Sequence, residues 1–114
     1  MIGVMAYDEN LAARIRAHVQ DDLDVTEKKM FGGLAFLASG NLAVAATSRG
    51  SLMLRCDPEE ADRLATEPGT NRMVMQGRAL HNWLVVDERT LATDEGLRGW
   101  LEVGLDFARS LPAK

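Results

Sequence analysis

The chain has 114 residues, of which 46% are apolar and 26% charged, and its formal net charge is −4. This composition predicts one soluble globular domain over residues 1–114. It disfavours direct nucleic-acid binding, because proteins that neutralise phosphates are normally basic. No apolar run approaches the ~18 residues of a membrane span, no secretory signal opens the chain, and the lone Cys56 fits a reducing compartment. We therefore expect a cytoplasmic protein that contacts neither nucleic acid nor a membrane, with residues 1–4 as a loose extension.

The first half of the chain predicts one helix followed by three strands. Asp8 suits the N-cap of a helix whose apolar residues recur at fourfold spacing: Leu11, Ile15 and Val19. Short turns at 39–41 and 48–50 separate strands over about 30–38, 42–47 and 52–56, and such turns favour antiparallel neighbours.

Period-two alternation assigns the apolar residues of these strands to two faces. One face is expected to hold Leu34, Phe36, Leu42, Val44, Leu52 and Leu54. The opposite face is also apolar, because it is expected to hold Ala35, Leu37, Ala43, Ala45 and Met53. This indicates that a second layer or a partner chain covers it, which hints at self-association.

The second half of the chain begins with a helix start at Asp57-Pro58, where an Asp cap precedes Pro at the first helical position. Pro68-Gly69 is typical of a helix stop. Two strands follow at about 72–75 and 83–87 with a turn near residues 76–78, and a last helix spans about 94–110. The order α-β-β-β-α-β-β-α predicts an α+β domain, a two-layer sandwich of helices on an antiparallel sheet.

Three segments carry a resemblance to a known family. They are MAYDENLAARIRAHV, VTEKKMFGGLAFLASGNLAVA and WLVVDERTLATDEGLRGWLEVGLDFARSLPAK, and their most specific parts are residues 28–33 and 107–112. Together they resemble the TfoX N-terminal domain family, also called TfoX/Sxy after regulators of natural competence. The resemblance implies a fold similar to that of type III secretion chaperones.

The resemblance also bears on domain organisation and on one loop. Competence regulators of that family pair this domain with a C-terminal helical domain, so the resemblance implies a stand-alone N-terminal domain here. Similar chains often read Gly-Arg-Pro-Met-Lys where residues 77–81 of this chain read Gly-Arg-Ala-Leu-His. We expect any binding specificity of that loop to differ accordingly.

Basic, aromatic and glycine residues are the candidates for recognition or anion binding: Lys28, Lys29, Phe31, Gly32, Gly33, Arg55 and Arg78. Two cations and the backbone N–H groups of the glycines could converge on a phosphate. The spacing matches neither a P-loop nor a dinucleotide fingerprint. We favour the alternative of a solvated lysine pair at the start of a strand, followed by glycines that allow a bulge or close packing of a helix.

No residue pattern points to catalysis, a metal or another cofactor. Cys56 precedes a helix N-terminus, which can lower a thiol pKa, but Asp57 opposes this effect and a buried, inert cysteine is favoured. His18 and His81 lack the spacing of a zinc site.

Two hypotheses follow. The first is a non-catalytic regulatory or protein-interaction module that binds a protein partner of unknown identity, with a homodimer as a further possibility. The second is a small-molecule or anion-binding protein, with weak enzymatic activity at most, that uses the region around residues 28–33.

Overall fold

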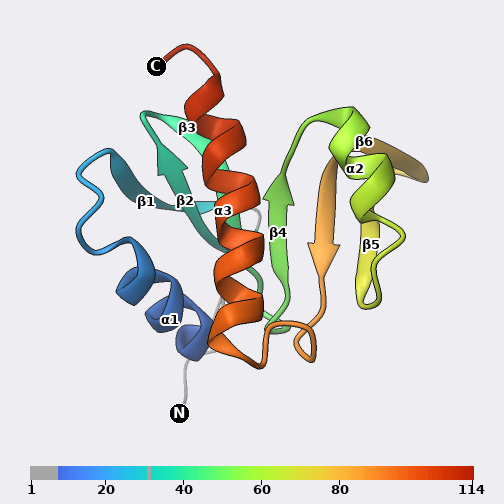
Figure 1. Ribbon diagram of the computed structural model, residues 1–114, viewed down its shortest axis with the longest axis horizontal. Helices are drawn as coiled ribbons and strands as arrows, with labels where there is room; N and C mark the ends of the chain where they lie inside the picture. Colours follow the sequence, from blue (N-terminus) through green and yellow to red (C-terminus); the bar gives the residue numbers. More distant parts are fainter. Residues whose placement is uncertain (1–7, 31) are drawn as a thin grey trace.

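The structure is a computed structural model that describes residues 8–30 and 32–114, so the expected extension at residues 1–4 lies outside the described part. Within these residues three helices accompany one antiparallel sheet of six strands (Figure 1). The helices are α1 (Glu9–Val19), α2 (Pro58–Leu64) and α3 (Asp94–Ser110). The strands are β1 (Val25–Met30), β2 (Gly33–Ala38), β3 (Asn41–Ala46), β4 (Leu52–Arg55), β5 (Thr70–Met75) and β6 (Arg78–Val86).

The α+β class and the two-layer arrangement are confirmed, but the predicted element order is one strand short. The segment expected as a single strand over about 30–38 contains the end of β1, a turn and all of β2. Gly32 turns the chain there with a φ of +71°. β1 escaped prediction because it is an edge strand whose residues 26–29 are all exposed, so it lacks an apolar alternation.

Each helix begins beside a side chain that caps its N-terminus. Asp8, Asp57 and Thr93 each accept a hydrogen bond from a backbone N–H two or three residues further on, at 2.8, 2.9 and 3.0 Å. These caps satisfy N–H groups that have no partner inside the helix. The predicted helix starts at Asp8 and Asp57 are thereby confirmed, and α3 has the predicted bounds.

The strand order is β1-β2-β3-β4-β6-β5, so β1 and β5 form the two edges of the sheet. Two tight hairpins have positive φ at both central residues: Ser39 (51°) and Gly40 (85°), and Gln76 (53°) and Gly77 (78°). This is the geometry of a type I′ turn, whose twist matches that of antiparallel strands. The turns predicted around these residues are confirmed.

All three helices pack on one face of the sheet, where the main core lies. α3 crosses the middle of the sheet, with α1 on the β1–β2–β3 side and α2 beside β6 (Figure 1). α3 approaches β3 closely at Gly104, where an added Cβ would lie 2.6 Å from Val44 Cγ1 and 2.7 Å from the Ala43 carbonyl oxygen. The largest buried side chains of this core come from both layers: Ile15, Phe36, Leu52, Leu54, Leu84, Leu91 and Leu101.

A β-bulge changes which side chains of β3 face the helices. Phe36 pairs with Val44, but Leu37 pairs with Leu42, so Ala43 is an extra residue in β3. Ala43 therefore packs in the helix-side core, and Leu42 packs on the opposite face. The predicted facing of these two residues is wrong, because a strict period of two cannot anticipate a bulge.

A second apolar cluster lies on the other face of the sheet, and every described side chain in it comes from a strand. Four members are buried and five are half-buried. We call this surface the open face, because none of the helices within residues 8–30 and 32–114 contributes to it. Its apolar members are Ala35, Leu42, Ala45 and Met53, with Met30, Leu37, Met73, Trp83 and Val85 packed around them.

Candidate functional site

The predicted recognition residues at 28–33, here called the hairpin motif, lie on the β1–β2 hairpin. Lys28 pairs with Ala35 and Lys29 with Leu34, so the two lysines project from opposite faces of the sheet. Both side chains are exposed. The anion-site alternative, which needs the two ammonium groups to converge, is therefore not supported. The favoured solvated lysine pair agrees with this exposure, although the pair lies within β1 and not at the start of a strand. Lysines in this position protect an edge strand from pairing with other chains.

The two glycines of the hairpin motif have different structural roles, and Phe31 lies outside the described residues. Gly32 is exposed and supplies the positive φ of the turn, with open space around it. Gly33 is buried in β2, and a Cβ there would collide with the backbone carbonyl oxygen of Ala46 on β3. The glycines were predicted to allow close packing of a helix, but the close neighbour of Gly33 is strand β3.

Arg55 ends β4 and lies between two aromatic rings. Its guanidinium carbon is 5.8 Å from the centroid of Trp83 and 5.4 Å from that of Phe107, within the range of cation–π attraction. The β3–β4 ladder ends at the pair Val44–Leu54, so Arg55 has no paired residue on β3, and its side chain reaches α3. Its Nε is buried and has no hydrogen-bond partner among the described residues.

Arg78 begins β6 at the tip of the β5–β6 hairpin, where it is exposed. The sheet order separates β1 from β4 by two strands and from β6 by three. At about 4.8 Å per strand, Lys28 and Arg78 are therefore roughly 19 Å apart along the sheet. The cations of the predicted set are spread over three strands, β1, β4 and β6, and do not form one anion site.

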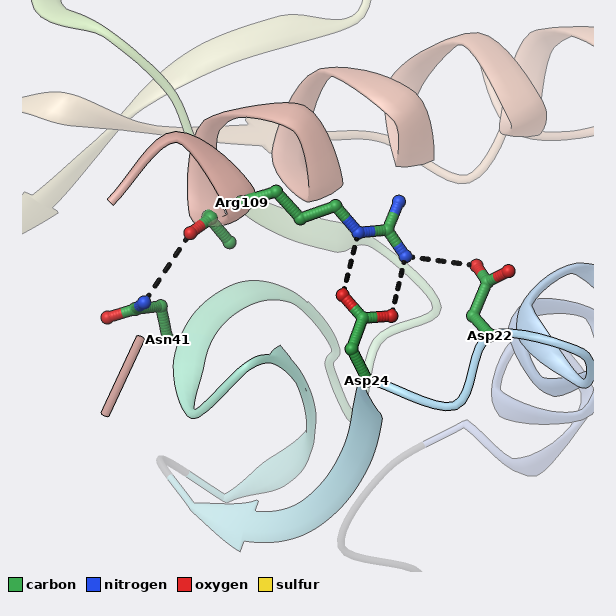
Figure 2. Close-up of polar contacts among 5 residues, drawn as sticks. Asp22, Asp24, Asn41 and Arg109 are labelled. Carbon is green, nitrogen blue, oxygen red and sulfur yellow. Dashed lines mark hydrogen bonds and ion pairs between the residues drawn. The ribbon is translucent and has the colours of Figure 1, made fainter. Parts of the chain in front are cut away.

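The other segment that carries the resemblance, residues 107–112, is here called the C-terminal motif. Arg109 on α3 donates hydrogen bonds from Nε and Nη2 to both carboxylate oxygens of Asp24, at 2.9 and 3.0 Å, and from Nη2 to Asp22 at 3.2 Å (Figure 2). The guanidinium holds the pKa of Asp24 below its usual value, and the carboxylates raise the pKa of Arg109. This cluster ties the end of α3 to the loop between α1 and β1.

Asn41 completes the attachment of the C-terminal motif. It is 2% exposed, and its side-chain amide donates to the carbonyl oxygens of Ala108 at 3.4 Å and Pro112 at 2.9 Å (Figure 2 draws the first). The backbone N–H of Lys114 donates to the carbonyl of Ser39 at 2.9 Å. The β2–β3 turn and the C-terminus are thus held together, and the motif has a structural role.

Sequence reasoning missed the partners of the C-terminal motif. Arg109 is 85 residues from Asp24, and Asn41 is 67 residues from Ala108. No local spacing encodes contacts over such separations. The only available signal was the motif itself, and it did not reveal what Arg109 binds.

Cys56 is buried with 1% exposure, as the inert-cysteine interpretation predicts. The pKa of its thiol is raised to about 11, mainly by burial and also by the carboxylates of Glu60 and Asp57, while Arg72 lowers it by less. The thiol is therefore protonated at neutral pH and is a poor nucleophile. His18 lies on α1 and His81 on β6, and no group of three or more metal-ligating side chains occurs within the described residues.

Comparison with known proteins identifies one family. The TfoX N-terminal domain family matches residues 17–108, which include all six strands and the whole hairpin motif. The chain therefore belongs to the TfoX N-terminal domain family. No curated protein and no solved structure matches it. None of the helices in the described part of the chain has the length and apolar character needed to cross a membrane.

Proposed function

We propose that this chain is a non-catalytic, regulatory protein-binding module and that the open face of its sheet is the surface that contacts the partner. One observation carries the proposal. The open face gathers half-buried apolar side chains from β1, β2, β5 and β6, whereas every described helix packs on the other face.

The residue types on this face support the proposal. Trp83, Met30 and Met73 lie on it, and aromatic residues and methionine are enriched in protein interfaces. An exposed edge strand also offers backbone groups to a partner.

Two hollows among the described residues are smaller than a usual site for a small molecule. The hollow between α1 and α3 measures about 250 Å³ and the one between α2 and α3 about 280 Å³. Sites for small ligands usually measure about 300–1,000 Å³ and enclose the ligand. The described residues of the hairpin motif also provide no converging cations, which the anion-binding hypothesis requires.

Photo-crosslinking in the native cell tests the proposal. The photoreactive residue p-benzoylphenylalanine replaces Leu37 on the open face or, as a matched control, Glu102 on the exposed face of α3. We expect a discrete protein adduct from position 37 and none from position 102. An adduct from position 102 alone would refute the assignment of the surface, and an adduct between two copies would show a homodimer.

A further inference from the structure

Charge is divided unequally between the two layers of the molecule. Within the strands that the structure describes, there are five basic side chains (Lys28, Lys29, Arg55, Arg72 and Arg78) and one acidic side chain, a net charge of +4. The helices and connecting segments hold the remaining 8 basic and 16 acidic side chains, a net charge of −8. The acidity of the chain therefore belongs to its helices and connecting segments. Two of the five cations of the strands project on the helix side, because Lys29 and Arg72 pair with residues of the main core, and Arg72 forms an ion pair with Asp62.

The single acidic side chain of the strands does not reach the open face. Glu27 pairs with Phe36, which packs in the helix-side core, and Arg16 of α1 donates to its carboxylate at 2.7 and 2.8 Å. Lys28, one residue further on, projects from the open face and is exposed. The strand residues of the open face thus combine apolar side chains with cations and no carboxylate.

Arg55 adds a partly desolvated cation beside the aromatic member of this face. Its guanidinium is stacked near Trp83, which belongs to the open face, and its buried Nε has no hydrogen-bond partner among residues 8–30 and 32–114. Charge-assisted hydrogen bonds between a guanidinium and a carboxylate are the strong ones in proteins. Arginine and tryptophan are also the residue types most enriched at interface hot spots.

We infer that the open face binds an acidic polypeptide segment that also carries apolar side chains. This inference rests on the proposed function and specifies the partner's chemistry. Apolar partner residues would pack on Leu37, Val85 and Trp83, while carboxylates would meet Lys28 and Arg55. Twofold pairing of this face with a second copy is disfavoured, because it would set these cations against cations.

Selection from a random 12-residue peptide library displayed on phage, against the full purified chain at low salt, tests the inference. We expect the selected peptides to be enriched in both carboxylate and large apolar residues. A synthetic peptide of the selected sequence should bind about tenfold more weakly to the Lys28→Glu variant, because like charges then face each other. Raising the salt concentration should weaken binding to the unmodified chain, since the pairs on the rim are screened.

Lys29→Glu is the matched control, because it makes the same charge change on the same strand but on the helix side of the sheet. Its affinity for the selected peptide should stay within about twofold of the unmodified chain. Equal weakening by Lys28→Glu and Lys29→Glu would overturn the inference, as would selection of basic or uncharged peptides or of none. So would equally tight, Lys28-dependent binding of a single-stranded oligonucleotide, which would show a general anion surface.

Three outcomes separate this inference from the proposed function. A protein adduct from position 37 whose crosslinked segment is not acidic would refute the inference and leave the protein-binding function standing. Sedimentation that shows a dimer, dissociated by Val85→Glu on the open face, would assign the face to a second copy and also refute the inference. Absence of any adduct from position 37 would refute the proposed function itself.

Discussion

The two segments that carry the family resemblance have opposite environments. The C-terminal motif is fastened at several points, through Arg109 to Asp22 and Asp24 and through its backbone carbonyls to Asn41. The described residues of the hairpin motif lie on an edge hairpin, with both lysines exposed and only Gly33 tightly packed. A segment that identifies a family can therefore either hold the fold together or remain available for contact, and its environment shows which.

The largest expected loss of stability lies in the hairpin motif. It would contradict a simple division into a structural C-terminal motif and an exposed hairpin motif. Gly33→Ala places a Cβ against the Ala46 carbonyl oxygen, so β2 and β3 must move apart. We expect a loss of about 3 kcal/mol in the free energy of unfolding, measured by urea denaturation. The control Gly32→Ala has open space around the Cβ and should lose about 1 kcal/mol, from positive φ alone. Equal losses would show that backbone conformation, not packing, decides both sites.

Asn41→Ala tests how firmly the C-terminal motif is attached. The substitution leaves the Ala108 and Pro112 carbonyls without their side-chain donor at a site that is 2% exposed. We expect a loss of about 2 kcal/mol in the free energy of unfolding. Asn71→Ala, at an exposed position on β5, is the control and should lose less than about 0.5 kcal/mol. A loss at Asn41 no larger than at Asn71 would mean that water replaces the amide at no cost.

Arg109→Met removes the ion pairs of the same motif and keeps the apolar stem. The side chains of Arg109, Asp22 and Asp24 are each about a third exposed, at 35–37%. Solvent screening therefore limits the expected loss in the free energy of unfolding to about 1 kcal/mol. Arg98→Met, on an exposed position of α3, is the control with little expected change.

The same variant has a defined pH dependence. Arg109 lowers the folded-state pKa of Asp24 from its ordinary value of 3.8, so the contribution of the pair is present above that value and is lost as pH falls through the folded pKa. Urea denaturation at several pH values should therefore show the stability difference between the unmodified chain and Arg109→Met at neutral pH. The difference should shrink below about pH 4. A difference that persists at low pH would assign the effect to packing of the arginine stem.

Smaller effects on stability are expected at the exposed end of the hairpin motif. Lys28→Glu and Lys29→Glu should each change the free energy of unfolding by less than about 0.5 kcal/mol, because both side chains are exposed and neither is needed for packing. Thermal unfolding followed by circular dichroism measures this. A loss above about 1 kcal/mol in either variant would show that the lysines support the hairpin.

Cys56, which belongs to neither motif, is expected to react very slowly with thiol reagents in the folded chain. Its thiol is buried and its pKa is about 11, so the thiolate fraction is negligible near neutral pH. Iodoacetamide labelling in native buffer should be slow and nearly unchanged around pH 7, and fast once urea unfolds the chain. Rapid labelling of the native chain would revive the reactive-thiol hypothesis.

Much of the fold followed from local sequence rules. The caps at Asp8 and Asp57, the turn residues at 39–40 and 76–77 and the apolar spacing of α3 were sufficient to place these elements. β1 could not be predicted, because this edge strand buries little on either face. Its residues can therefore be polar and show no apolar alternation. The bulge at Ala43 could not be predicted either, because it depends on the pairing of β2 with β3.

The sequence predicted which residues are candidates for recognition, but it did not predict how they are arranged in space. Lysines, glycines and arginines near strands suggested recognition, but their spacing along the chain did not show that Lys28 and Lys29 project from opposite faces. Strand pairing made Arg55 a neighbour of Trp83, and helix packing added Phe107. Neither contact has a local signature.

The sequence by itself determined the helices, most strands, the α+β class and the resemblance to a family, because caps, turns and periodicity act over a few residues. Only the tertiary structure decided which motif is structural and which surface is cationic and apolar. Strand order, the bulge and contacts across up to 87 residues determine where each side chain projects, and none of these is a local property of the chain.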